Sequence, residues 1–239
     1  MTKGRHSFRQ VNDSVHVIKL PGRFQQRRFD KSLAMKFYFF LPALLLVALS
    51  ACSQPQHVGG PCEGCEAIYE NKIPFEQLPS FDTLPGYYEK GNKLMVIGKV
   101  FKADGKTPAA DVVLYLYHTN IEGIYPTKGN EKDWGRRHGY LRGWLKTNEK
   151  GEYSFLTIRP GAYPGRENPE HIHVTIKEPG KNEYWIDDFH FDDDPILTAA
   201  ARKNFKNRGG NGIVKVTRSG DLLTTSRNIV LGLNIPGYK

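Results

Sequence analysis

His171 and His173 are separated by a single residue, within the predicted strand His171–Lys177. Because successive side chains of a β-strand alternate between its two faces, both imidazoles are predicted to point the same way. Two neighbouring imidazoles on one face can bind one metal ion. The alternative is that they are two ordinary strand histidines, and the surrounding residues decide between these interpretations.

Tyr163 lies shortly before the two histidines, in the sequence Pro-Gly-Ala-Tyr-Pro-Gly of residues 160–165. Proline and glycine restrict such a turn, so the phenol is predicted to be presented rather than packed. A free phenol has a pKa near 10, and only a strongly charged cation favours its phenolate at neutral pH. The other interpretation of Tyr163 is an aromatic turn residue without a chemical role.

Several motifs of the chain resemble those of the intradiol ring-cleavage dioxygenases, such as the protocatechuate and catechol dioxygenases. They occur in the family's order from about Lys93 to the C-terminus. The motifs are Leu-Tyr-Leu-Tyr-His-Thr-Asn at 114–120 with Gly-Ile-Tyr at 123–125, Gly-Glu-Tyr-Ser-Phe at 151–155, Thr-Ile-Arg-Pro-Gly-Ala-Tyr-Pro at 157–164, Pro-Glu-His-Ile-His at 169–173 and Phe-Asp-Asp-Asp-Pro at 191–195.

The resemblance implies a non-haem iron(III) site with Tyr125, Tyr163, His171 and His173 as the four ligands. Two tyrosinates and one hydroxide neutralise a ferric ion, while neutral imidazoles add no charge. The implied substrate is a small aromatic diol, which O2 cleaves between its two hydroxylated carbons to a muconate-type diacid. In that mechanism Tyr163 is displaced and helps to accept a proton, and Arg166 is the second predicted catalytic residue.

Of the four predicted ligands, Tyr125 has the most rivals in the sequence. Tyr115 and Tyr117 alternate within an apolar strand and are predicted to be core or sheet-face residues. Tyr140 heads a strand beside Arg142 and is the main alternative to Tyr125.

Three positions depart from the family's pattern. Asn168 stands where many members have an arginine, Gly165 where many have a tryptophan, and Asp188 where some have a glutamine. These differences put the substrate and rate in doubt more than the metal. One alternative is a non-catalytic β-sandwich that binds a metal or ligand. Another is a copper or zinc site that combines the paired histidines with other ones, namely His118, His138 or His190.

Short, regularly spaced β-patterns with turn signals between them predict an all-β sandwich or barrel. The family resemblance implies a transthyretin-like β-sandwich with long loops around the metal, and members of such a family often form homo-oligomers. Only residues 195–207 have a helical pattern. The predicted strands are 94–100, 112–118, 140–146, 153–158, 171–177, 184–191, 213–217 and 227–233.

The net charge of +9 is concentrated in residues 1–51, which hold nine of the 34 basic side chains and two of the 25 acidic ones. The remainder is nearly balanced, so a nucleic-acid interface is not expected. Residues 35–51 have the pattern of a signal peptide and end in a box that resembles the bacterial lipoprotein cleavage site before Cys52. This predicts lipidation of Cys52 and a membrane-anchored protein of the cell envelope; a signal anchor or an ordinary secretory signal is the alternative. Residues 1–34 are interpreted as a gene-model extension.

Residues 52–90 are rich in proline and glycine and are predicted to be a linker before residues 91–239, which are predicted to form the β-sandwich domain that resembles the intradiol dioxygenases. The linker contains Cys62 and Cys65, which are predicted to form a local disulfide in an oxidising compartment. A redox-active or metal-binding Cys-x-x-Cys is the competing interpretation, but no second such pair completes a zinc site.

Overall fold

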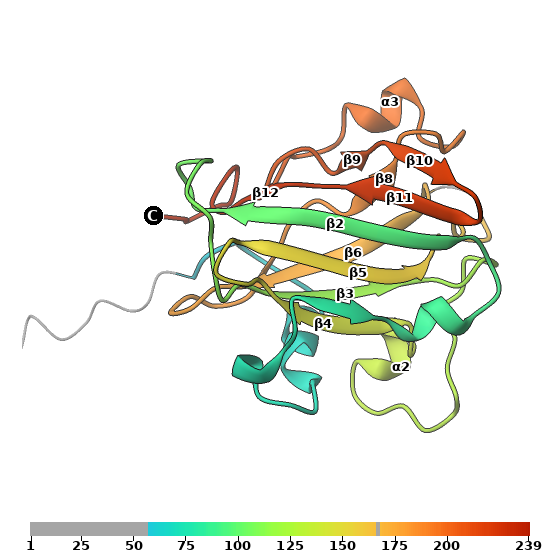
Figure 1. Ribbon diagram of the computed structural model, residues 1–239, viewed down its shortest axis with the longest axis horizontal. Helices are drawn as coiled ribbons and strands as arrows, with labels where there is room; N and C mark the ends of the chain where they lie inside the picture. Colours follow the sequence, from blue (N-terminus) through green and yellow to red (C-terminus); the bar gives the residue numbers. More distant parts are fainter. Residues whose placement is uncertain (1–56, 166–167) are drawn as a thin grey trace, which may run out of the picture. The chain divides into compact units, whose positions relative to one another are not determined.

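The computed structural model describes residues 57–165 and 168–239, which form two β-sheets packed face to face (Figure 1). The prediction of an all-β sandwich with only short helices is therefore confirmed. The predicted signal peptide, Cys52 and Arg166 lie outside the described residues.

The first sheet is built around β2 and β5, which pair antiparallel along most of their lengths. β11 pairs parallel with one part of β2 and β12 with another, while β1 pairs parallel with β5. In spatial order the strands are β1 (Phe81–Thr83), β5 (Glu152–Ile158), β2 (Lys93–Phe101), β11 (Leu222–Ser226) and β10 (Val216–Ser219), with β12 (Ile229–Val230) beside β2.

The second sheet carries the two histidines and has β3 and β6 at its centre. These strands pair antiparallel, with Tyr117 opposite His173 and Leu116 opposite Val174. In spatial order the strands are β4 (Arg142–Lys146), β3 (Val113–His118), β6 (His171–Lys177), β8 (Phe189–Phe191) and β9 (Ile213–Val214), with β7 (Tyr184–Trp185) also on β6.

Side-chain alternation gives the second sheet two different faces. Its inner face packs against the first sheet, and the resulting core includes Leu116 and Val174 from this sheet and Val96 and Phe155 from the other. Its outer face carries the residues in between, among them both histidines of the predicted metal site. The outer face is covered by loops and short helices rather than by another sheet.

The prediction that residues 52–90 are a linker is wrong for the described part, from residue 57 onward. Its 3-10 helix η1 (Cys65–Glu70) buries Ala67 and Ile68 against Val113 and Tyr115 on the outer face of the second sheet. β1 adds an edge strand to the first sheet. Apolar side chains in this proline-rich segment therefore cover sheet surface that would otherwise be exposed.

Four further predictions need correction. The predicted strand 213–217 is divided between β9 of the second sheet and β10 of the first, and the predicted strand 227–233 is reduced to β12. The predicted strand 184–191 is interrupted at residues 186–188, between β7 and β8, because its antiparallel pairing with β6 shifts by one residue there: Trp185 lies opposite Thr175, whereas Phe189 lies opposite Ile172. The predicted helix 195–207 is reduced to α3 (Ala199–Arg202), which Thr198 caps by accepting a hydrogen bond from the Ala201 amide. The other short helices are η2 (Phe75–Gln77), η3 (Pro85–Tyr88) and α2 (Gly135–His138).

None of the helices in the described part of the chain has the length and apolar character that a membrane crossing requires.

Candidate metal centre

Three segments bring the four predicted ligands together on the outer face of the second sheet. β6 supplies His171 and His173, the loop after β3 supplies Tyr125, and the loop after β5 supplies Tyr163. The two loops approach each other so closely at Gly123, which has a φ of +76°, that an added Cβ would lie 1.9 Å from the Ala162 carbonyl oxygen. Glycine is required there because its backbone fits both the positive φ and this contact.

The four donor atoms converge on one small volume. The Tyr125 hydroxyl lies 2.5 Å from the Tyr163 hydroxyl and 2.8 Å from Nε2 of His173. Nε2 of His173 lies 3.0 Å from Nε2 of His171 and 3.3 Å from the Tyr163 hydroxyl. The residues that the sequence singled out as ligands thus form a single cluster of two oxygens and two nitrogens.

Hydrogen bonds on the far side of both imidazoles determine which nitrogens face the cluster. Nδ1 of His171 lies 2.6 Å from the Pro169 carbonyl oxygen, which can only accept, so Nδ1 carries the proton. Nδ1 of His173 lies 3.0 Å from the Asp188 carboxylate and donates in the same way. In the neutral imidazoles both Nε2 atoms therefore present lone pairs to the cluster, an arrangement typical of metal-binding histidines.

The donor set fits a trivalent cation. Burial raises the pKa of both Tyr125 and Tyr163, and the hydrogen bond to Tyr163 raises that of Tyr125 further, so without a cation both phenols stay protonated. Only two phenol protons are then available for four facing donor atoms. A bound cation would interact with every lone pair, and two phenolates plus the nearby Asp188 carboxylate would balance three positive charges.

Asp188 contributes a negative charge next to the donor cluster without being one of its four ligands, because it contacts the nitrogen of His173 that does not face the cluster. His171, His173 and Asp188 lie close enough for a metal cluster, with the atoms concerned within 4.8 Å of one another. However, Asp188 bonds the nitrogen of His173 that points away from Tyr125 and His171. Burial would raise the pKa of Asp188, but the neighbouring histidines, His173 above all, lower it to about 2, so the side chain is a carboxylate at neutral pH.

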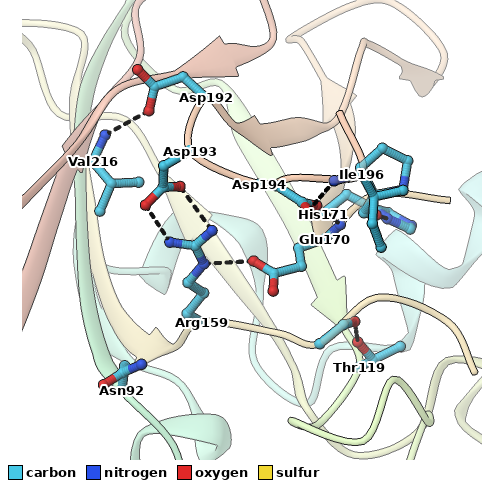
Figure 2. Close-up of polar contacts among 12 residues, drawn as sticks. Asn92, Thr119, Arg159, Glu170, His171, Asp192, Asp193, Asp194, Ile196 and Val216 are labelled. Carbon is cyan, nitrogen blue, oxygen red and sulfur yellow. Dashed lines mark hydrogen bonds and ion pairs between the residues drawn. The ribbon is translucent and has the colours of Figure 1, made fainter. Parts of the chain in front are cut away.

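A network of charged residues holds the turn before His171 in place (Figure 2). Arg159, at the end of β5, donates to Glu170 at 2.6 Å and forms a two-pronged ion pair with Asp193. The Glu170 amide in turn donates to the Asp194 carboxylate at 2.7 Å. These contacts connect β5 and the segment after β8 to the residue next to His171, so they fix the position of that imidazole.

The rival ligands of the sequence analysis do not join the cluster. The Tyr140 hydroxyl donates to Glu89, and that of Tyr115 pairs with Nδ1 of His138. Tyr117 stacks on both His138 and His173, at centroid distances of 3.8 and 4.3 Å. It supports the site through its ring.

The remaining histidines are also placed elsewhere. His118 points into the sandwich, where its two nitrogens pair with Thr119 and Thr157. The ring centroid of His190 lies 5.5 Å from that of His171, and His190 is no part of the group of close donor atoms. The described residues therefore do not bring a third histidine to the pair, as a three-histidine copper or zinc site requires.

Two cavities adjoin the site, and both are lined by His173 and Asp188. The larger, about 420 Å³, is also lined by Tyr163 and His171, and Asn168 contributes to its wall. The smaller, about 260 Å³, is bounded by the turn between Cys62 and Cys65, which form a disulfide. The segment expected to be a linker is thus part of the surroundings of the site.

Asp188, Arg159 and Glu170 are functional neighbours that the sequence analysis missed. Asp188 was noted only as a difference from the family, and its bond to His173 depends on the register in which β8 pairs with β6, since Phe189 lies opposite Ile172. A run of acidic residues beside a strand was the only signal in the sequence for this network.

A family model described as dioxygenase matches residues 69–209, more than half of the chain. The chain belongs to the intradiol dioxygenase family. Members of this family are oxidoreductases that act on catechol-type compounds with O2, generally with non-haem iron(III), and they often form oligomers.

Among the relatives of this chain, the protocatechuate 3,4-dioxygenase beta chain of Burkholderia cepacia is 30% identical over 113 residues, which cover 45% of this chain and 48% of the relative. The 6-chlorohydroxyquinol 1,2-dioxygenase of Cupriavidus pinatubonensis is 34% identical over 107 residues, 38% of this chain and 37% of the relative. The chain thus spans less than half the length of these relatives. The dioxygenase domain of a carbohydrate-binding fusion protein from Streptomyces sp. SirexAA-E has the same fold, with a TM-score of 0.51 at 22% identity over 74% of this chain and 96% of that one.

Proposed function

We propose that this protein is an iron(III)-dependent intradiol dioxygenase that cleaves a catechol-type diol with O2. The observation that carries the proposal is the convergence of the Tyr125 and Tyr163 hydroxyls with Nε2 of His171 and His173. In the overall reaction one diol and one O2 give one acyclic diacid, with both oxygen atoms retained and no external reductant. Ferric iron, when bound, supplies a Lewis acid that withdraws electron density from the diol oxygens.

The residues of the site divide the remaining work. Tyr163 lines the larger cavity and Tyr125 does not, so Tyr163 is the donor that an incoming diol would replace. Its oxygen then accepts a proton from the diol. Asp188 and the Pro169 carbonyl keep Nε2 of the two histidines directed at the cluster.

The cavity provides the positioning that the reaction needs. Its walls include the rings of Tyr163, His171, His190 and Phe205, which offer flat surfaces to an aromatic ring. Holding the ring in one orientation beside the donor cluster replaces an encounter in solution by a fixed geometry.

We further propose that the protein acts in the cell envelope, anchored through a lipid on Cys52. The support is the apolar run of residues 37–51 that ends in Leu-Ser-Ala-Cys. Cys52→Ser should leave an unprocessed precursor without a diacylglycerol adduct, as mass spectrometry of the membrane fraction would show. Normal processing and release of this variant without detergent would refute the anchor.

The catalytic proposal is tested by metal analysis, O2 consumption and product analysis on the same iron-loaded sample. The expected result is one iron per chain, a visible tyrosinate-to-iron band, and consumption of one O2 per catechol. Labelled 18O2 should place one labelled atom in each new carboxyl group. An iron-replete protein that is coloured but inert towards catechol, protocatechuate and hydroxyquinol would instead be a non-catalytic metal protein, which the differences at Asn168 and Gly165 would favour.

A further inference from the structure

We propose that Asp188 makes the site selective for aromatic diols without an anionic ring substituent, and that it disfavours diols that carry a carboxylate. This inference rests on the proposed function, because it concerns the substrate class of the same site. It starts from the position of one carboxylate next to both cavities.

Asp188 borders the space available to a ring on either side of His173. It lines the cavity of about 420 Å³ together with Tyr163, and the cavity of about 260 Å³ together with Tyr117. Whichever cavity receives the part of the ring that is remote from the donor cluster, this carboxylate is part of its wall. The inference therefore does not depend on choosing between them.

The bond to His173 fixes the position of this charge. One oxygen of Asp188 accepts the Nδ1 proton of His173 at 3.0 Å, and the side chain is about one quarter exposed. A partly buried carboxylate with a fixed position repels a second anion more strongly than a mobile charge on the surface does. If a diol binds as a dianion in place of Tyr163, Tyr125 and the two diol oxygens would supply the three negative charges that balance a ferric ion, and the charge of Asp188 would then have no offset.

The described walls of the cavities offer no cation to a carboxylate. In the larger cavity Asp188 is the one charged residue among the described lining residues, and the others there are aromatic, apolar or neutral polar groups such as Asn204 and Phe205. In the smaller cavity the second charged lining residue is Glu63, which is also acidic and pairs with Arg137. Because Arg137 offsets the charge of Glu63, a carboxylate on the substrate would meet the unpaired negative charge of Asp188 in both places.

Two aromatic residues in the wall of the larger cavity suit a neutral ring. His190 and Phe205 lie with their ring centroids 4.6 Å apart, and His190 is 8% exposed. Its Nδ1 is buried and has no hydrogen-bond partner among the described residues. A neutral substituent that donates a hydrogen bond, such as a hydroxyl or hydroxymethyl group, can bond to the free oxygen of Asp188, whereas a carboxylate has no proton to donate.

The test compares two diols of nearly equal size, 3,4-dihydroxybenzyl alcohol and 3,4-dihydroxybenzoate. The iron-loaded protein is titrated with each under anaerobic conditions to obtain Kd from the change in its visible band, and kcat/KM is then measured in air. We expect the neutral diol to be preferred about tenfold or more in both quantities. We also expect this preference to weaken as ionic strength rises.

Asp188→Asn keeps the size of the side chain and an oxygen that accepts the His173 proton, but removes the charge. The preference should fall about tenfold towards equality in this variant. Asp221→Asn, which removes an exposed charge between β10 and β11 on the other sheet, is the matched control and should retain the wild-type preference. Because each result is a ratio of two diols on one sample, differences in iron content cancel.

Equal use of both diols by the wild type, or an unchanged preference in Asp188→Asn, would overturn the inference while leaving the dioxygenase proposal intact. If Asp188→Asn fails to fold or to bind iron, the inference is still tested by the preference of the wild type for the neutral diol and by the dependence of that preference on ionic strength. Diols that bind with the expected preference but are not cleaved would support the inference and contradict the catalytic proposal. If the iron-loaded protein binds neither diol, both are wrong.

Discussion

The two faces of the second sheet share the same strands but do different work. On β3 and β6, the inward side chains such as Leu116 and Val174 pack against the first sheet, whereas outward ones such as Tyr117 and His173 build the site. One step along a strand therefore separates a residue that stabilises the fold from one that prepares the chemistry. The comparison predicts that substitutions should separate by face, with stability lost on one and metal binding lost on the other.

The largest expected loss of stability comes from the core between the two sheets, against which the inner face packs. Phe155→Ala on β5 removes a fully buried ring that meets Phe189 edge to face, and should lower the free energy of unfolding by about 3–5 kcal/mol. The iron bound per folded molecule should not change. Denaturant unfolding and metal analysis on the same preparation check both statements. A folded variant that lacks iron would show that the two faces are not independent.

His118 provides a second test of the difference between the two faces of the sheet. It directly follows Tyr117, whose side chain lies on the outer face, but its own side chain points into the core. Burial lowers its pKa to about 4, while the unfolded histidine titrates near 6.5. The unfolded state thus binds more protons between these values, so stability is lost as pH falls from about 7 towards 4, by roughly 3 kcal/mol for this group.

In metal-free protein, His118→Gln should therefore flatten the dependence of stability on pH by about one proton. His138 and His190, whose pKa values burial also lowers to about 4, remain in the variant and keep part of the slope. Thermal unfolding between pH 4 and pH 7 is the measurement. An identical slope in the variant and the wild type would mean that His118 is not neutral inside the sandwich.

The smallest effect is expected from the disulfide that borders the outer face. Replacing Cys62 and Cys65 by serine opens a very short loop, so the loss of stability should be about 2 kcal/mol or less. Iron content and colour should be unchanged, because neither sulfur belongs to the donor cluster. Loss of iron from the folded double variant would show that this turn does more than cover the site.

The assignment of residues to the inner or the outer face could largely be predicted from the sequence, since side chains alternate between the two faces along each strand. The strand His171–Lys177 was predicted with its observed bounds, and the paired histidines follow from it. Tyr125 could be chosen over Tyr140 only through the family resemblance, because nothing local distinguishes two loop tyrosines.

The features that the sequence did not predict depend on contacts between segments that are distant in the chain. β1 is three residues long, alternates poorly and is stabilised by pairing with β5, about seventy residues away in the chain. The roles of Asp188 and Arg159 likewise require the register of β8 and the end of β5 relative to β6. Such contacts depend on how the whole sandwich closes, and a local pattern does not record them.

The central claim is that Tyr163 on the outer face is an anionic ligand of a ferric ion, and the visible spectrum of Tyr163→Phe tests it most directly. Tyr117→Phe is the matched control, since it loses a phenol oxygen of the same face that is not in the donor cluster. We expect Tyr163→Phe to fold normally but to bind iron more weakly, with a shifted or weakened tyrosinate-to-iron band and no ring cleavage. Tyr117→Phe should keep the wild-type band. A wild-type spectrum in iron-replete Tyr163→Phe would contradict the account.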